Sequence, residues 1–263
     1  MRDILLHCHI FKNSGTAVDV LLQRAFEDQW DSLETKVPRH AVPGQEFVAF
    51  AHANPHLRAI SSHGAQLPVP RADGISFHPI LFLRHPIDRV GSVYAFERRQ
   101  PIGSSGIGIE VAQQEDLAGY VRWRLAENNG CVIRNFQTLH LAAYEGDLRF
   151  AVAGEDEFRR AREILQSLPF LGLVDQFDES IRRLRTYIRP FTRKFSVEDR
   201  FPSINASLER AATLGERIAE IEAALGPNLY AELLEHNHFD LALYAEAKQL
   251  FYQTVQKEAS LHL

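Results

Sequence analysis

The sequence has few cysteines and no long apolar run. Cys8 and Cys131 are too few for a disulfide framework, and both are expected to remain reduced thiols. No uninterrupted apolar stretch reaches the roughly 20 residues that a transmembrane helix needs. The N-terminus also lacks the pattern of a signal peptide, because His7, Cys8 and His9 interrupt its first apolar run. We therefore expect no transmembrane segment and no secretory leader.

Two common nucleotide-binding motifs are missing as well. The ATP- or GTP-binding pattern G-x-x-x-x-G-K-[ST] is absent, since no glycine precedes a lysine anywhere in the chain. The glycine-rich residues 101–109 are not a dinucleotide fingerprint, because the third glycine is missing and no strand precedes them. A net charge of −5 argues against non-specific binding of nucleic acid.

A chain of 263 residues with 45% hydrophobic residues can bury a full core, and no linker or repeat divides it, so we expect a single domain over residues 1–263. Strand-like and helix-like patterns alternate along it, which predicts an α/β fold. The predicted strands or strand-like turns are residues 3–10, 46–51, 57–62, 79–84, 148–153 and 171–174. The predicted helices are residues 16–27, 88–98, 114–127, 131–144, 155–167, 204–225 and 239–257, with 204–225 ending at Gly226-Pro227.

Residues 9–16, His-Ile-Phe-Lys-Asn-Ser-Gly-Thr, have the pattern of an anion-binding turn. They follow the apolar run 4–6 and precede a helical pattern that starts near Gly15 or Thr16. The first backbone N–H groups of a helix have no internal partner and favour an anion. Gly15 permits close approach of the backbone, Ser14 and Thr16 add hydroxyls, and Lys12, one of only five lysines, adds a charge. An ordinary solvated turn remains an alternative from this segment alone.

A second segment strengthens the case for an anion. Arg84 stands where the apolar run 80–83 ends, and Ser92 lies eight positions further on, inside the next predicted helix. A strand-end arginine and a helix serine can converge on one phosphate. Asp88 is placed to cap that helix. Two anion sites on one sheet predict a ligand with separated phosphates, which is the shape of 3′-phosphoadenosine 5′-phosphosulfate (PAPS).

Residues 9–16 resemble the H-I-P-K-T-G-G-T loop of the heparan sulfate 2-O- and 6-O-type carbohydrate sulfotransferases, and residues 83–94 resemble their L-R-[DH]-P-x-x-R-x-x-S-x-Y element. Three more segments follow in the family's order: residues 135–138 resemble N-x-Q-T, 172–180 resemble G-L-[TV]-E-x-F-D-E-S, and 237–244 resemble N-x-x-D-x-x-L-Y. The departures are Phe11 for proline, Asn13 for threonine and Ser14 for glycine.

The resemblance implies a P-loop-like, three-layer α/β fold with a central, mainly parallel sheet flanked by helices and a helical C-terminal part. It implies PAPS as co-substrate, a carbohydrate acceptor and no required metal. The expected nucleotide ligands are Lys12, Asn13, Ser14, Gly15, Thr16, Arg84 and Ser92, with Lys12 also stabilising the leaving phosphate. Because animal relatives are anchored in Golgi membranes, a chain without an anchor suggests a bacterial cytoplasmic enzyme.

Catalysis also needs a base for the acceptor hydroxyl. The resemblance implies a histidine in a G-H or H-G segment upstream of Arg84, which here is His63 in Ser62-His63-Gly64; His52 and His85 are the next candidates. His7 and His9 share one face of a strand, but the sequence shows no third or fourth ligand beside them, so no metal site is expected.

Several features stay open at this point. Residues 101–109 are either a lid over the acceptor or a surface loop, and the basic run 182–194 is either an acidic-saccharide surface or a solvated helix face. Tyr120 and Trp123 are either a sugar-stacking platform or core. A P-loop phosphotransferase and a non-catalytic nucleotide-binding relative remain alternatives to the sulfotransferase. The acceptor's identity and the oligomeric state are open too.

Overall fold

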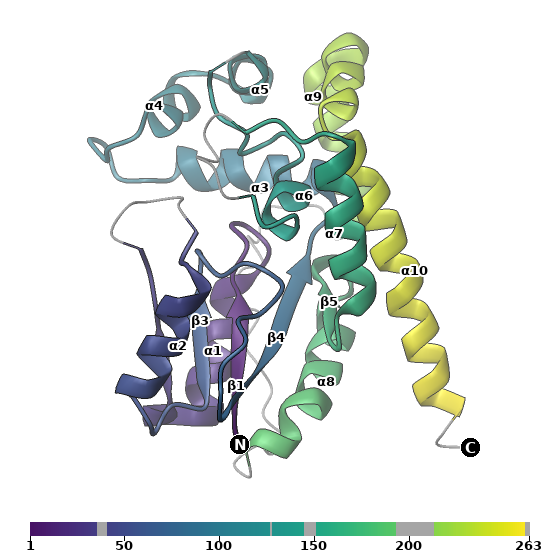
Figure 1. Ribbon diagram of the computed structural model, residues 1–263. Coiled ribbons are helices and arrows are strands. Elements are labelled where there is room, and N and C mark those ends of the chain that lie inside the picture. Colours follow the sequence, from purple (N-terminus) through teal and green to yellow (C-terminus); the bar gives the residue numbers. More distant parts are fainter. Residues whose placement is uncertain (36–40, 127, 145–150, 193–212, 261–263) are drawn as a thin grey trace.

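The computed structural model describes residues 1–35, 41–126, 128–144, 151–192 and 213–260. Within these ranges the chain forms a five-stranded, all-parallel sheet in the order β2-β3-β1-β4-β5, with helices packed on both sides (Figure 1). The strands are β1 (Arg2–Cys8), β2 (Trp30–Ser32), β3 (Ala59–Ser62), β4 (Ile75–Leu83) and β5 (Leu171–Leu173). The predicted α/β fold with a parallel central sheet is confirmed.

The two faces of the sheet are covered by different helices. Successive residues of β1 point to opposite faces, so Leu5 joins one cluster of buried side chains and Leu6 the other. Helices α1 (Gly15–Phe26) and α8 (Phe177–Ile188) pack on the face of Leu5. Helices α2 (Gly44–Ala53), α7 (Glu155–Ser167) and α10 (His238–Ser260) pack on the face of Leu6. This gives the three layers that the resemblance implied.

A helical layer lies beyond the edge where the strands end (Figure 1). It contains α3 (Pro86–Arg98), α4 (Ile107–Gln114), α5 (Leu117–Leu125), α6 (Phe136–Leu141) and α9 (Leu214–Glu235). Val90 of α3, Val121 of α5 and Leu229 of α9 belong to one buried apolar cluster, which fixes these helices to each other. Three short 3₁₀ helices, residues 27–29, 174–176 and 189–191, complete the described elements. No helix in the described ranges combines the length and apolar character that crossing a bilayer demands.

The strand register brings the ends of the central strands together. Cys8, the last residue of β1, pairs with Ser62 of β3 and with Leu81 of β4. In parallel sheets, ligands bind outside the carboxyl ends of the strands. The segments that follow β1, β3 and β4 therefore start side by side, and these are the segments that carry Lys12, His63 and Arg84.

Some predicted elements differ from the structure. Residues 46–51 were expected to be a strand but lie in α2, where Phe47 and Ala51, one turn apart, are buried and Ala49 is exposed. Residues 131–144 form only the short helix α6, because Asn135 has a left-handed backbone that stops a helix before it. Residues 151–153 are not a strand; the rest of the expected strand 148–153 lies outside the described residues.

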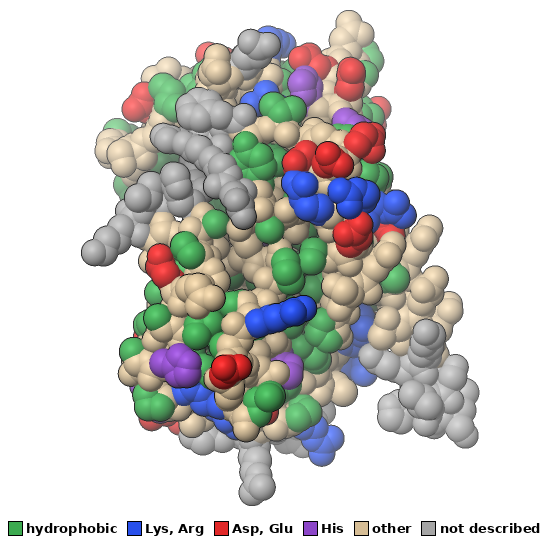
Figure 2. Space-filling model, in the orientation of Figure 1, with side chains coloured by type: hydrophobic (Ala, Val, Ile, Leu, Met, Phe, Trp, Pro, Cys, Tyr) green, Lys and Arg blue, Asp and Glu red, His purple; other side chains and the backbone are tan. Residues whose placement is uncertain are grey.

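Other boundaries shift. Helix α9 does break at Gly226, which has φ 72°, but it resumes and continues to Glu235; residues 204–212 of the predicted helix lie outside the described part. The predicted loop 101–109 ends at Gly106, where α4 follows. Strand β2 was not predicted. On the surface seen in Figure 2, acidic and basic side chains lie interspersed over α7, where Arg159 pairs with Glu163 and Arg160 with Glu157.

Candidate site at the C-terminal edge of the sheet

The loop after β1 has the geometry of an anion-binding turn. Lys12 and Ser14 both adopt left-handed backbone conformations, with φ of 66° and 62°, and α1 starts at Gly15 as predicted. The first N–H groups of α1 have no intrahelical acceptor, and no acidic residue lies in its first turn. The positive end of α1 therefore faces this loop without a competing carboxylate in its first turn. Thr16 is exposed and Ser14 is half-buried.

Gly15 is required by a neighbouring side chain. A Cβ at position 15 would lie 2.0 Å from Cδ2 and 2.2 Å from Nε2 of His9. We expected the glycine to admit a ligand to the backbone; in the structure its immediate role is to make room for the His9 ring. That ring in turn stacks on His63, with the two ring centroids 3.9 Å apart. The His9 ring thus lies between His63 and the start of α1.

The second segment holds the first one in place. Arg84 donates from Nη1 to the carbonyl oxygen of Lys12 at 3.2 Å. Arg89 is fully buried and donates from Nε to the carbonyl oxygen of Phe11 at 3.0 Å. Hydrogen bonds to charged donors are the stronger ones. The structure therefore brings the two predicted anion elements together, with arginines of one bound to the backbone of the other.

Asp88 does not cap helix α3 as expected. Its carboxylate instead accepts from Nε of Arg84 at 2.7 Å and from Nε of Arg217, on α9, at 2.8 Å. Burial acts to raise the pKa of Asp88, but the charges of the two arginines lower it to about 2. The capping prediction failed because a tertiary partner, Arg217, competes for the carboxylate. Ser92, on the same helix, is buried.

Asn13 was predicted to face the ligand, and this prediction is wrong for its side chain. The side chain is buried and donates to the carbonyl oxygen of Phe82 at 2.9 Å and to Oε1 of Gln137 at 2.8 Å. Its backbone N–H donates to the carbonyl oxygen of Ile10 at 3.1 Å. Asn13 thus fastens the loop to the end of β4 rather than pointing out of it.

Residues 135–138 and 237–244, two further segments of the family resemblance, form a hydrogen-bond network around Gln137. Gln137 donates to the carbonyl oxygen of Arg84 and accepts from its N–H, at 2.9 and 3.0 Å. Asp240 of α10 accepts from the N–H groups of Gln137 and Thr138 and from the Thr138 hydroxyl. The N–H of Asn135 donates to Oδ1 of Asn237 at 3.3 Å. Residues 135–138 and 237–240 therefore hold the loops in position through buried hydrogen bonds.

His63 carries a carboxylate partner. Its Nδ1 lies 3.0 Å from Oε1 of Glu34, which also accepts the His63 backbone N–H at 3.0 Å. The hydrogen bond that His63 donates to Glu34 raises the pKa of His63, and burial only partly opposes this rise. About half of the His63 side chain is exposed, 52%. The bond at Nδ1 leaves Nε2 as the atom that can take a proton.

His63 lines a cavity of about 800 Å³ next to the anion loop. Apolar side chains form most of its wall, with a few polar groups between them. The polar residues lining it include Glu34, His63, Gln66, Glu97, Arg124 and His140. Gly106 and Ile107 of the predicted loop 101–109 also border it, whereas His52 and His85, the other proposed bases, are not part of this wall.

His140 is a cavity residue that the sequence reasoning missed. It lies on α6 and is 5% exposed, both ring nitrogens are buried, and the Ala65 backbone is their polar neighbour. Burial lowers its pKa to about 4, so the ring is neutral near pH 7. Its position three residues after Gln137 was the available signal, because residues at i and i+3 of a helix are neighbours on its surface.

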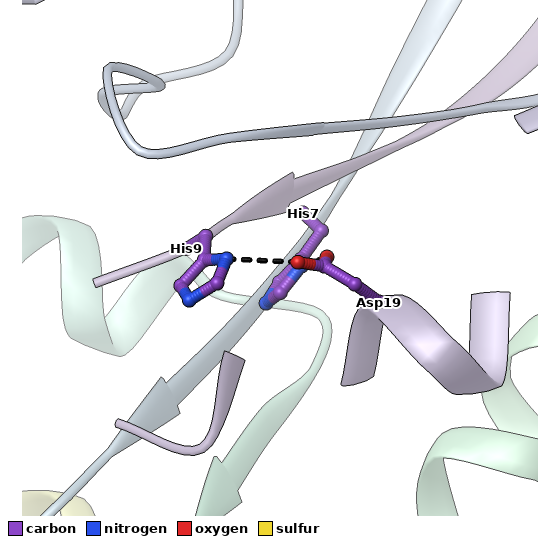
Figure 3. Close-up of side chains that lie close together, drawn as sticks. All are labelled: His7, His9 and Asp19. Atoms are coloured by element: carbon purple, nitrogen blue, oxygen red, sulfur yellow. Dashed lines mark hydrogen bonds and ion pairs between the residues drawn. The ribbon is translucent and has the colours of Figure 1, made fainter. Parts of the chain in front are cut away.

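A second histidine cluster lies behind the loop. Asp19 of α1 accepts from Nδ1 of His7 at 2.7 Å and from Nδ1 of His9 at 2.9 Å (Figure 3). Burial raises the pKa of Asp19, but the two hydrogen bonds outweigh it and hold the pKa below its ordinary range. We expected no third ligand beside His7 and His9; Asp19 supplies one, and the three ligand atoms lie within 4.8 Å of each other. Each carboxylate oxygen is already matched to one imidazole N–H.

The remaining candidates have structural roles. Tyr120 is fully buried and donates to Glu97, so it belongs to the core and not to a sugar platform; Trp123 beside it is half-buried and stacks on Arg124. Arg182 pairs with Glu179, as a solvated helix face predicts. Arg193 and Lys194 lie outside the described residues.

The chain is similar in sequence to an archaeal protein. No protein-family model matches the chain. A protein of Archaeoglobus fulgidus, described as uncharacterized, is 31% identical over 261 residues, covering 95% of this chain and 98% of the archaeal one. The alignment thus spans nearly the whole length of both chains.

Proposed function

This chain belongs to the same family as the Archaeoglobus fulgidus protein, and we propose that it is a PAPS-dependent sulfotransferase acting on a hydroxyl group of a carbohydrate. One arrangement carries the proposal. The loop before α1 carries Lys12 in a left-handed backbone conformation, and His9 in this loop stacks on His63. His63 is paired with the Glu34 carboxylate and lines a cavity.

The nucleotide is proposed to bind across the two loops. The first N–H groups of α1, the hydroxyls of Ser14 and Thr16, and the Lys12 ammonium favour the phosphosulfate. Arg84 and Ser92 are assigned to the 3′-phosphate. Arg84 already donates from Nε and Nη1, which leaves Nη2 for the phosphate. Asn13 takes no part through its side chain, which is turned inward.

The reaction follows from these positions. Nε2 of His63 takes the proton of the acceptor hydroxyl while Glu34 holds the Nδ1–H. The acceptor oxygen forms a bond to sulfur, the bond from sulfur to the bridging phosphate oxygen breaks, and 3′,5′-ADP leaves with that electron pair. Lys12 stabilises the charge that grows on the leaving phosphate. No step requires a metal ion.

The finer assignments of compartment and partners are part of the same proposal. Cys8 and Cys131 are both free and buried, and burial raises the pKa of their thiols to about 12 and about 11. Buried, protonated thiols are inert, as expected for a protein of the reducing cytoplasm. We propose a cytoplasmic enzyme that binds no nucleic acid.

Ligand binding tests the proposal first. Thermal shift with 3′,5′-ADP, ATP and GTP should give stabilisation by 3′,5′-ADP alone, since ligand binding to the native state raises its stability. Stabilisation by ATP or GTP instead would indicate a P-loop phosphotransferase. Turnover of radiolabelled PAPS with glycan and glycolipid acceptors separates an enzyme from a non-catalytic relative. The non-catalytic alternative is favoured by the inward-turned side chain of Asn13 and by the Arg84–Asp88 pair.

A further inference from the structure

The cavity beside His63 has a wall that is suited to an apolar ligand. Its lining includes aromatic and aliphatic side chains from the first loop, α3, α4, α6 and the segment that precedes α6, namely Phe11, Phe96, Ile107, Ile109, Val132 and Phe136. Its volume of about 800 Å³ lies within the roughly 300–1,000 Å³ of pockets that enclose a small molecule. A ligand here gains free energy mainly by removing apolar surface from water.

The charged groups of the wall are already paired with each other. Arg124 donates from Nη2 to both oxygens of Glu97, at 2.6 and 2.7 Å, and both residues are buried. The second carboxylate of the wall, Glu34, is bonded to His63. Recruiting Arg124 to an anionic ligand would leave Glu97 buried without its partner, which is costly. The wall therefore disfavours an acceptor whose body carries carboxylates.

We propose that this cavity holds the acceptor and selects an uncharged hydroxyl compound with an alkyl or aryl body, as in an alkyl or aryl glycoside, over an acidic polysaccharide. This inference rests on the proposed sulfotransferase function, because only that function makes the bound compound an acceptor. It departs from the heparan-type acceptor that the sequence resemblance suggests. The apolar wall and the mutually paired charges each support it.

Calorimetry on the full chain, with and without 3′,5′-ADP, tests the choice of ligand. Octyl β-glucoside, below its micelle concentration, should bind at least about tenfold more tightly than a tetrasaccharide of glucuronic acid and N-acetylglucosamine. Tighter binding of the acidic tetrasaccharide would overturn the proposal.

A pair of isoleucine variants tests the location. Ile109→Glu adds a carboxylate to the cavity wall and should weaken octyl β-glucoside at least about tenfold. Ile102→Glu is the matched control, because Ile102 is 98% exposed and lies outside the wall. Equal affinities of the two variants would place the ligand elsewhere and refute the proposal.

Nucleotide binding separates the two proposals. Binding of octyl β-glucoside without any binding of 3′,5′-ADP would support the ligand class but refute the sulfotransferase proposal.

Discussion

Nδ2 of Asn13 lies 2.8 Å from Oε1 of Gln137, so the loop after the first strand is fastened to a helix 124 positions further along the chain. The same Gln137 oxygen accepts the backbone N–H of Arg84. One buried side chain therefore links the two loops that are proposed to share a nucleotide, beside the bonds from Arg84 and Arg89.

Arg84→Ala should weaken the binding of 3′,5′-ADP by a few kcal/mol, about the effect of losing a charged hydrogen bond to phosphate. It should also remove the preference for 3′,5′-ADP over 5′-AMP, measured by calorimetry. The ratio of affinities is the informative quantity, because loss of the Arg84–Lys12 bond would affect both nucleotides alike. Unchanged discrimination would exclude Arg84 as the 3′-phosphate ligand.

Lys12→Ala should lower kcat by about 10²–10³, the effect of removing a donor to charge that develops in the transition state. Affinity for 3′,5′-ADP should fall much less than kcat, since the helix N-terminus and Arg84 remain. Single-turnover kinetics with PAPS measure this. If Lys12→Ala reduced only nucleotide affinity, the assignment of Lys12 to the leaving group would be incorrect.

His63→Ala should lower kcat and leave 3′,5′-ADP affinity nearly intact, because the base contacts the acceptor and not the nucleotide. The wild-type rate should rise with pH as His63 loses its proton, at a pH above the ordinary imidazole range because Glu34 raises the His63 pKa. Near-wild-type turnover of His63→Ala would point to another base.

Glu34→Gln removes the carboxylate that raises the His63 pKa. The acid limb of the pH–rate profile should therefore move to lower pH in this variant, with His63 still active as the base. The direction follows from the sign of the interaction: a negative neighbour favours the protonated imidazole. A limb that stays in place would mean that Glu34 and His63 do not form their bond in the working enzyme.

Gly15→Ala should destabilise the protein by about 1–3 kcal/mol, because its Cβ would overlap the His9 ring and force a buried side chain to move. Thermal unfolding measures the loss. Gly215→Ala is the matched control: a Cβ there meets nothing within 4 Å, and replacing a helical glycine should stabilise by roughly 0.4–1 kcal/mol. Similar melting temperatures of the two variants would argue against the packing of His9 on Gly15.

Asp19→Asn should cost about 1–3 kcal/mol, since one buried imidazole N–H loses its acceptor. Asp3→Asn, at the exposed Asp3–His78 pair, should have little effect.

Dialysis against EDTA should leave the melting temperature of the wild type unchanged, because Asp19 already satisfies both histidines. A melting temperature that falls with EDTA and recovers with Zn²⁺ would identify His7, His9 and Asp19 as a metal site. The contribution of Asp19 should disappear as pH falls, in keeping with its lowered pKa.

Much of the site's framework could be predicted from short segments. The apolar run 4–6, the small residues at 14–16 and the helical spacing after them predict a strand, a turn and a helix, because each depends on neighbouring residues only. The same holds for Arg84 at the end of β4 and for the helix that follows it. Residues 46–51 show the limit, since a short apolar run fits either a strand or a buried helix face.

The direction of individual side chains was decided by the tertiary structure. Asn13 turned inward because Gln137 and the carbonyl oxygen of Phe82 offered buried partners, and Asp88 left its helix cap for Arg217, 129 positions away. Asp240 found its partners in α6 for the same reason. A buried polar group must be satisfied by whichever partner packing brings to it. The sequence determined which chemical groups follow the parallel strands, whereas only long-range packing decided which of them turn inward to hold the loops together.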